Sequence, residues 1–248
     1  MSETSIPTLL VFTLGAIRER ARRALVPGRL QELEISLRES CLDAALAAGR
    51  ERGCRLEVCS PAPLPLPADA MNVPQPGAGF GHRLEWAMLD AFGRGAAPLI
   101  VVGTDTPGLS SRHLEQAVIL LEEDADRVVL GPSPDGGFYL LAARRPVEEL
   151  AAVRWCGKET LRDLLELLRA QGRPVALLEP MADLDRPADL ERWLAQGAEE
   201  EGRWRGLIRL FRAAFAGRNR PLPTCFPSSP GDPSSLLAGR APPVPPSW

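Results

Sequence analysis

Lysine is almost missing from this chain of 248 residues, because only Lys158 is lysine among 29 lysine and arginine side chains. We attribute this bias to genome composition rather than to chemistry, although arginine also binds phosphate groups well. A phosphate-binding P-loop needs Gly-x-x-x-x-Gly-Lys-[Ser/Thr] after an early strand, whereas the segment 157–160 lies far downstream and has the wrong residue after the lysine. The sequence therefore argues against a P-loop GTPase, although residues 105–108 match the Asp-x-x-Gly turn of that class.

Strong net charge, paired cysteines and long apolar runs are also missing. A formal net charge of −3 gives no electrostatic basis for a nucleic-acid or anionic-membrane partner. The five cysteines include no Cys-x-x-Cys pair, which favours a reduced, cytoplasmic location, and the two histidines (His82 and His113) share no metal-ligand spacing and are expected at the surface. No apolar stretch approaches about 18 residues and there is no signal peptide, so we expect a soluble cytoplasmic protein without a membrane partner. The oligomeric state stays open.

The most informative stretch is the apolar run 99–102, which ends shortly before Asp105. Four apolar residues bounded by turn formers are typical of a strand buried on both faces. Ligands of open α/β sheets bind just outside the carboxyl ends of the strands, so Asp105 is expected where a ligand or metal is met. From its position alone, the alternative that Asp105 only shapes the turn or caps the next helix is equally good.

The remaining pattern predicts an α/β fold with a Rossmann-like, mainly parallel sheet and helices on both faces. Apolar runs predict strands at 8–12, 55–59, 99–102, 127–131, 138–142 and 174–178. Helical spacing predicts a long helix from near Leu30, with stop signals at Gly49 and Gly53. It predicts three later helices, whose inward sides include residues 84, 88, 89 and 92 in the first, 114, 117, 118 and 121 in the second, and 161, 164, 165 and 168 in the third. In the long helix, Arg38 lies off the apolar stripe.

Composition also sets the expected domain limits. Residues 6–196 are predicted to form the folded domain, 197–217 a helical extension, and 218–248 a disordered tail rich in proline and serine. Residues 61–67 alternate proline with small apolar residues, which indicates an extended loop rather than an element.

Three acidic turns follow predicted strands: Thr104-Asp105, Asp135-Gly136-Gly137 and Asp183-Leu184-Asp185. Mg²⁺ prefers carboxylate oxygens and commonly keeps one or two protein ligands together with substrate phosphates. Two aspartates that meet at one sheet edge give such a site, and the ion then stabilises a departing diphosphate.

These turns, taken in order, resemble motifs of a bacterial family, DUF2064, whose members are described as glycosyltransferases or nucleotidyltransferases of the GT-A type. The matching segments are 103–109, 129–140, Trp155 with Thr160-Leu161, and 183–190. The resemblance covers about residues 8–195 and implies a nucleotide-diphospho-sugar transferase fold. It further implies that Asp105 and Asp185, with Asp183 as a possible addition, hold Mg²⁺ or Mn²⁺.

The family's Lys-Thr-Arg-Leu run, which is expected to bind the nucleotide phosphates, is altered in this chain. At the matching place the sequence is Ala21-Arg22-Arg23-Ala24-Leu25. Arg22 stands in for the lysine, Ala24 replaces the arginine, and Arg22 or Arg23 is expected to contact the phosphates instead. The change leaves two interpretations open, an active enzyme or a relative that has lost turnover.

Each of the remaining candidate residues has both a structural and a functional interpretation. Asp135-Gly136-Gly137 is also a hairpin signal, and the resemblance assigns Asp135 to the reacting group or acceptor and the two glycines to close substrate approach. Asp183 or Asp185 can cap the next helix. Gln75 in its glycine-rich turn is expected either beside the nucleotide or in a surface loop, and Trp155 either on a sugar or base or in ordinary packing.

The leading functional prediction is a metal-dependent glycosyl- or nucleotidyltransferase that uses a nucleotide-sugar or another nucleoside phosphate. Asp105 and Asp185 bind the metal, Asp135 is catalytic, and Arg22, Arg23, Gln75, Gly136, Gly137 and Trp155 bind substrate. The alternative is a catalytically degenerate relative of the GT-A type that serves as a nucleotide-binding or protein-interaction module.

Overall fold

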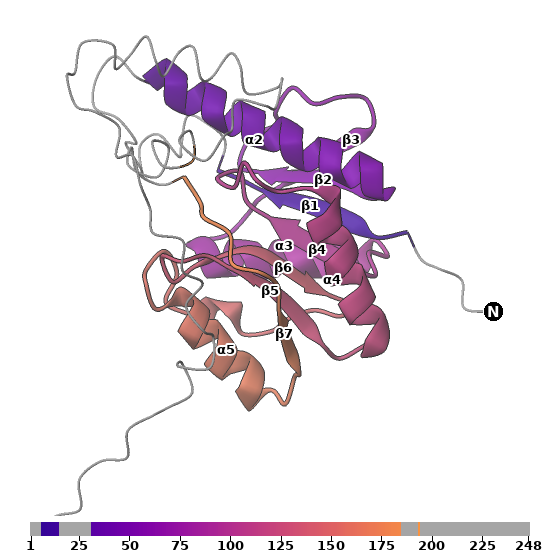
Figure 1. Ribbon diagram of the computed structural model, residues 1–248, viewed down its shortest axis with the longest axis vertical. Coiled ribbons are helices and arrows are strands. Elements are labelled where there is room, and N and C mark those ends of the chain that lie inside the picture. Colours follow the sequence, from indigo (N-terminus) through magenta and orange to yellow (C-terminus); the bar gives the residue numbers. More distant parts are fainter. Residues whose placement is uncertain (1–5, 15–30, 185–192, 194–248) are drawn as a thin grey trace, which may run out of the picture. The chain divides into compact units, whose positions relative to one another are not determined.

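A computed structural model describes residues 6–14, 31–184 and 193 of the chain (Figure 1). The chain divides into two units, Met1–Gly217 and Arg218–Trp248, and every described residue belongs to the first. The helical extension and tail predicted from composition lie outside the described residues. Within the described part, no helix is long and apolar enough to cross a membrane.

Strands and helices alternate along the chain, as the sequence predicts. The strands are β1 (Thr8–Phe12), β2 (Arg55–Ser60), β3 (Ala70–Pro74), β4 (Leu99–Val102), β5 (Val128–Pro132), β6 (Phe138–Ala143) and β7 (Val175–Leu177). The helices are α2 (Gln31–Arg52), α3 (Phe80–Gly93), α4 (Ser111–Glu123), the short 3-10 helix η1 (Leu150–Ala152) and α5 (Thr160–Ala170).

Within the described residues, seven strands form one sheet in the order β3-β2-β1-β4-β6-β5-β7. All neighbours are parallel except β6, which is antiparallel to both β4 and β5. The register places Val11, Val102, Leu140 and Gly131 at one level across four strands. The segments that follow β1, β4 and β5 therefore leave the sheet at the same edge, which we call the carboxyl edge.

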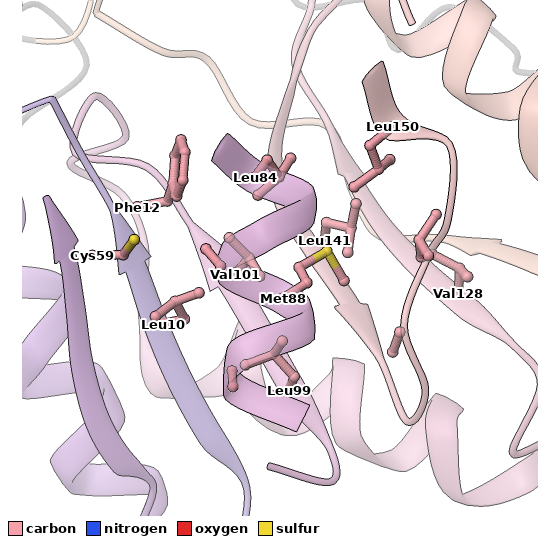
Figure 2. Close-up of a cluster of buried hydrophobic side chains, with 14 of the residues drawn as sticks. Leu10, Phe12, Cys59, Leu84, Met88, Leu99, Val101, Val128, Leu141 and Leu150 are labelled. Atoms are coloured by element: carbon pink, nitrogen blue, oxygen red, sulfur yellow. The ribbon is translucent and has the colours of Figure 1, made fainter. Parts of the chain in front are cut away.

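Successive residues of the central strands alternate between two apolar cores, one on each face of the sheet. Helices α3 and α5 cover one core, in which Leu84, Met88 and Leu164 are buried together with strand residues such as Leu10 and Val101. Figure 2 shows Leu84 and Met88 of α3 beside Leu10 and Val101. Helices α2 and α4 cover the other core, which includes Ala45, Leu114, Leu9, Ile100 and Leu140. The predicted fold class, with helices on both faces of a mainly parallel sheet, is confirmed.

Two local predictions about the elements are wrong, and one strand was not predicted. Of the two predicted stop signals of the long helix, Gly53 is confirmed, because the helix ends at Arg52, whereas Gly49 lies within the helix. A Cβ at Gly49 would lie 2.5 Å from Leu56 Cδ2, so this glycine allows the helix to pack closely. Leu89 is 48% exposed instead of facing inward, and the buried side of α3 uses Ala87 and Ala91. Strand β3 was not predicted, since on this edge strand only Val73 is buried and the apolar signal is weak.

Candidate functional site at the carboxyl edge

Asp105 lies at the carboxyl edge directly after β4, as its sequence position predicts. Its main-chain oxygen accepts a hydrogen bond from Leu184 N at 2.9 Å. Its carboxylate lies over Gly103, where a Cβ would be only 2.7 Å from Oδ1. Glycine at position 103 therefore leaves the room that this carboxylate occupies, and the backbone bond fixes the residue against the 183–184 segment.

The segment after β7 crosses the carboxyl edge to reach Asp105 (orange in Figure 1). Leu178 N donates to Leu130 O and Met181 N donates to Pro132 O, so the segment first follows the end of β5. It then reaches Leu184, whose N–H bonds Asp105. Two of the three acidic turns, far apart in sequence, thus have adjacent main chains, and Asp183 immediately precedes the bonded residue.

Asp185, the second predicted metal ligand, lies outside the described residues, and so do Arg22 and Arg23. Their predicted roles stay predictions. Within residues 6–14, 31–184 and 193, no cluster of three or more His, Cys, Asp or Glu side chains could hold a metal ion. One or two carboxylates that share an ion with substrate phosphates need no such cluster, and that is the common arrangement for Mg²⁺.

Helix α2 supplies two side chains on this side of the sheet that the sequence analysis did not assign to the site. Burial raises the pKa of the Cys41 thiol, and the negative charge of Asp105 raises it further, whereas Arg38 lowers it. Burial and the nearby Asp105 carboxylate therefore favour the neutral thiol of Cys41 over the thiolate. Arg38 is 5% exposed, although its place off the apolar stripe predicts a solvated side chain.

Gln75 is buried and bonds to the backbone ends of two strands. Its Nε2 donates to Thr13 O at 3.0 Å and to Cys59 O at 3.1 Å. These two bonds tie the glycine-rich turn after β3 to the segments that end β1 and β2. Gln75 is therefore not part of a mobile surface loop, one of the two predicted alternatives, and it joins two strand ends instead. A direct contact with substrate stays untested.

Thr13 and Thr104 connect the ends of β1 and β4. Their hydroxyl oxygens lie 3.1 Å apart, and both residues are buried. Thr13 N also donates to Cys59 O at 3.0 Å. Thr13, Cys59, Gln75, Thr104 and Asp105 form what we call the β1–β4 corner, in which polar groups from separate strand ends bond one another.

A second group of candidates, residues 133–137 and 154–161, forms the β5–α5 corner of the same edge. Asp135 is exposed in the tight turn between β5 and β6, and its Oδ1 accepts from Gly137 N at 2.9 Å. Gly136 adopts φ +93°, and a Cβ there would overlap the carbonyl oxygen of Lys158. Leu161 N donates to Gly136 O at 2.9 Å. The turn joins β5 to β6, as the hairpin interpretation predicts, and it is also bonded to the start of α5. A substrate role for these residues stays a prediction.

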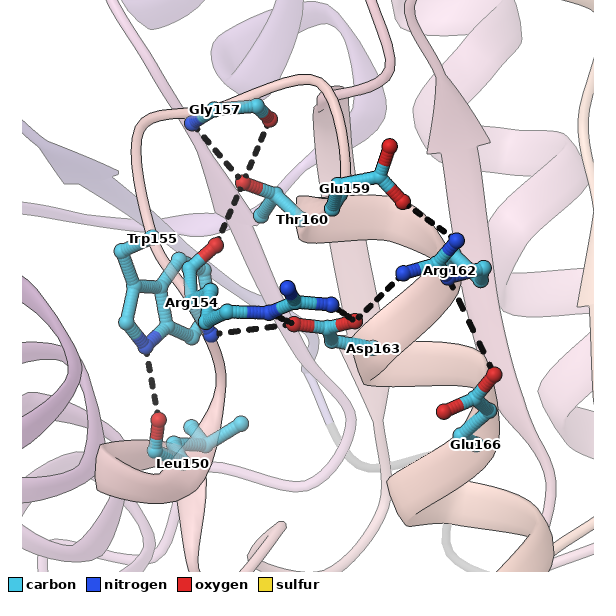
Figure 3. A network of polar contacts seen from close by, with 9 residues as sticks. All are labelled: Leu150, Arg154, Trp155, Gly157, Glu159, Thr160, Arg162, Asp163 and Glu166. Carbon is cyan, nitrogen blue, oxygen red and sulfur yellow. Dashed lines mark hydrogen bonds and ion pairs between the residues drawn. The ribbon is translucent and has the colours of Figure 1, made fainter.

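Trp155 packs within an aromatic row. Its ring lies 4.8 Å from that of Phe80 and 5.9 Å from that of Phe138, measured between centroids. Its Nε1 donates to Leu150 O at 2.6 Å (Figure 3). These contacts support ordinary packing, and a stacking role toward a sugar or base stays untested.

The loop after Trp155 is fixed by its own polar contacts (Figure 3). Thr160 Oγ1 donates to the carbonyl oxygens of Arg154 and Gly157. The Arg154 guanidinium donates from Nε to Asp163 Oδ2 at 2.6 Å and from Nη2 to Asp163 Oδ1 at 2.8 Å. These bonds hold the pKa of the Asp163 carboxyl below its usual value. These side chains serve the local structure of the loop.

His113 is not the surface residue that the sequence predicts. It is partly buried at the start of α4, where Ser110 N donates to its Nδ1 at 3.2 Å, and its ring meets the edge of Tyr139. Burial lowers the pKa of His113 from the usual 6.5, so the ring is neutral and its Nδ1 can accept this bond. His113 therefore fixes the helix that follows the Asp105 turn.

The fold is shared with solved bacterial proteins. A candidate nucleotide-diphospho-sugar transferase from Desulfovibrio desulfuricans G20 superposes with a TM-score of 0.71 at 21% identity, covering 86% of this chain and 96% of that one. Rv0371c from Mycobacterium tuberculosis H37Rv superposes with a TM-score of 0.50 at 18% identity, covering 77% of this chain and 100% of that one.

The family resemblance predicted from the motifs is confirmed. Residues 36–157 match the profile of the family described as "Uncharacterized protein conserved in bacteria (DUF2064)". This match includes the Asp105 and Asp135 turns and Trp155, but it stops before residues 183–185 and begins after Arg22 and Arg23. A phosphoenolpyruvate guanylyltransferase from Sphaerobacter thermophilus is 28% identical over 193 residues, which cover 76% of this chain and 91% of the relative. These findings support the predicted class of enzyme, a glycosyl- or nucleotidyltransferase.

Proposed function

We propose that this protein is a metal-dependent nucleotidyltransferase. It would transfer a nucleotidyl group from a nucleoside triphosphate to an oxygen of a small anionic acceptor. The observation that carries the proposal is the Leu184 N to Asp105 O hydrogen bond, because it joins two distant acidic turns at the carboxyl edge. Ligands of open α/β sheets bind at this edge. The guanylyltransferase relative favours nucleotidyl transfer over glycosyl transfer, and it makes GTP the first nucleoside triphosphate to test.

The donor atoms suit Mg²⁺ or Mn²⁺, since both prefer carboxylate oxygens. Asp105 would hold the ion together with Asp185, and Asp183 is the nearby described alternative. A bound divalent ion supplies positive charge that offsets the triphosphate and the leaving diphosphate. Arg22 and Arg23 would contact the phosphates, since a guanidinium matches phosphate oxygens in geometry and charge.

The reaction would be a substitution at the α-phosphorus. An acceptor oxygen forms the new bond, the bond to the bridging oxygen breaks, and the electron pair leaves with pyrophosphate. Asp135 would orient the acceptor or take its proton, and Gly136 and Gly137 would allow a close approach. Gln75 would hold the glycine-rich turn after β3 in place beside the nucleotide, through its bonds to the ends of β1 and β2. Trp155 would lie on the side of the site where the acceptor binds.

The test is a thermal-shift screen of nucleoside triphosphates, nucleoside diphosphates and nucleoside diphospho-sugars, each with and without Mn²⁺. Hits are followed by assays of pyrophosphate release with small phosphorylated and carboxylated acceptors. Stabilisation by a triphosphate that requires Mn²⁺, followed by pyrophosphate release, supports the proposal. Release of a nucleoside diphosphate from a diphospho-sugar would instead identify a glycosyltransferase.

A second candidate function is a binding module without turnover. The segment Arg22-Arg23-Ala24 favours it, because the family's Lys-Thr-Arg-Leu run is altered there. The same screen separates the two functions: stabilisation by a nucleotide with no product for any acceptor supports the module, and product formation rejects it.

A further inference from the structure

Every main-chain and side-chain polar group of Thr13 takes part in a bond at the carboxyl edge. Its N–H donates to Cys59 O at 3.0 Å, and its carbonyl oxygen accepts from Gln75 Nε2 at 3.0 Å. Its hydroxyl oxygen lies 3.1 Å from that of Thr104. Thr13 is 5% exposed and Thr104 4%, so these bonds form away from water.

The hydroxyl pair lies beyond the end of the backbone ladder between β1 and β4. That ladder runs from the Thr8–Leu99 pair to the Val11–Val102 pair. Thr13 and Thr104 each follow the last pair by two residues, so their side chains take over the link where the ladder stops. Asp105 is the next residue along the chain. The direction of its carboxylate depends on how the backbone at Thr104 is held.

We propose that the Thr13–Thr104 hydroxyl bond is a positioning contact that sets the affinity of Asp105 for the divalent ion. This rests on the proposed function, in which Asp105 is a metal ligand. Leu184 N holds the main chain of Asp105 from one side, and Thr13 holds the preceding residue from the other. Groups that orient a metal ligand commonly change metal affinity tenfold or more when they are removed. Neither threonine needs to touch the ion.

A purely structural role makes a different prediction from a positioning role. Replacing one threonine with valine removes this hydroxyl contact while the other hydroxyl stays buried, which lowers the stability of the fold. Replacing both removes the two hydroxyls together, and such double replacements are nearly neutral for stability. A positioning role predicts that metal affinity stays low in the double variant although its stability recovers.

The experiment is a titration of Mn²⁺ by electron paramagnetic resonance on the full chain with a saturating nucleoside triphosphate. Thermal unfolding is measured on the same samples. The variants are Thr13→Val, Thr104→Val, their combination, Thr104→Ser, Asp105→Asn and Thr8→Val. Thr8 is the matched control, since it is buried on strand β1, which ends one residue before Thr13, and its Oγ1 makes no hydrogen bond within the described residues.

We expect both single valine variants and the double variant to bind Mn²⁺ about tenfold more weakly than the wild type. Thr104→Ser, which keeps the hydroxyl, and Thr8→Val should bind it as the wild type does. The unfolding midpoint of the double variant should lie closer to the wild type than those of the single variants.

Recovery of Mn²⁺ affinity together with the unfolding midpoint in the double variant would overturn the positioning role. Unchanged affinity in all valine variants, with affinity lost in Asp105→Asn, would overturn it too while the proposed metal site stands. Wild-type Mn²⁺ binding by Asp105→Asn would instead remove the metal site on which the inference rests.

Discussion

The two corners of the carboxyl edge differ in the distance over which their polar bonds act. In the β1–β4 corner, Gln75 bonds Thr13 and Cys59, which are 62 and 16 positions away in the chain. In the β5–α5 corner, the side chains of Asp135 and Trp155 bond main-chain atoms within five positions, and the longer Leu161 N to Gly136 O bond joins two main-chain groups. The first corner therefore uses side chains to hold separate strand ends in place beside Asp105, and the second uses its side chains within its own loops.

Bonds within one loop and bonds between distant strand ends point to different roles. In the β5–α5 corner, the local structure is enough to explain why these residue types are present, since a tight turn and a helix start need their bonds. The side-chain bonds of the β1–β4 corner are not local, and they lie beside the Asp105 carboxylate. The β1–β4 corner is the stronger candidate for chemistry, and the following changes test the difference.

The largest effect is expected for Gly136→Ala in the β5–α5 corner. The new Cβ would overlap the Lys158 carbonyl oxygen, and φ +93° disfavours any L side chain. We expect a loss of unfolding free energy of about 3 kcal/mol or more, measured by urea denaturation. Gly172→Ala is the control: φ is +67° and nothing lies within 4 Å of the new Cβ, so about 1 kcal/mol is expected. Equal losses in both variants would contradict close packing at Gly136.

Asp105→Ala tests the β1–β4 corner by activity. Removal of a group that stabilises charge in the transition state should lower turnover by about 100-fold or more, with little change in the urea midpoint. Asp69→Ala is the matched control, since Asp69 is an exposed carboxylate paired with Arg50 at 2.6 Å and precedes β3 on the opposite edge. Turnover at the wild-type rate in Asp105→Ala would remove Asp105 from the chemistry.

Asp135→Asn asks whether the β5–α5 corner does more than form a turn. Asparagine keeps an oxygen that can accept from Gly137 N, so the turn and its stability should be preserved. Loss of the charge should lower turnover about tenfold, less than at Asp105, because Asp135 is assigned to orienting the acceptor. Measurement of KM for the acceptor and of kcat locates the effect. An unchanged rate would make Asp135 a turn residue only.

The smallest effect is a pH dependence from His113. Its pKa is lowered in the folded state, so protonation favours the unfolded chain. Its contribution to stability is complete above about pH 6.5 and is lost as the pH falls through the lowered folded-state pKa. His113→Gln keeps an acceptor for Ser110 N at every pH and should remove this dependence, which we expect to be about 1 kcal/mol at most. Urea denaturation at pH 7.5 and pH 5 measures it, and identical losses in both proteins would exclude His113 as their source.

The central strands and the place of Asp105 could be predicted because both are properties of short stretches. A buried apolar run that stops near an aspartate, as in 99–105, marks a strand and its carboxyl end together. Edge strand β3 lacks such a run, and Gly49 functions through contact with Leu56 across the α2–β2 turn. Six of the seven strands could therefore be predicted, and the edge strand β3 could not.

The bonds that assemble the site could not be predicted, because their partners are set by the fold. The contact between Leu184 N and Asp105 O joins residues 79 positions apart (184 minus 105). Gln75 was assigned to substrate since its glycine-rich neighbours suggest a ligand loop, yet its buried amide bonds strand ends. Side chains with main-chain partners far away leave no local signal.

The most direct test is a crystal structure of the protein grown with Mn²⁺ and a nucleoside triphosphate, with anomalous scattering from manganese recorded. We predict an anomalous peak about 2.1 Å from a carboxylate oxygen of Asp105, with Asp185 or Asp183 and phosphate oxygens completing the coordination. A manganese peak on the nucleotide with the Asp105 carboxylate turned away from it would contradict the metal site proposed at the β1–β4 corner.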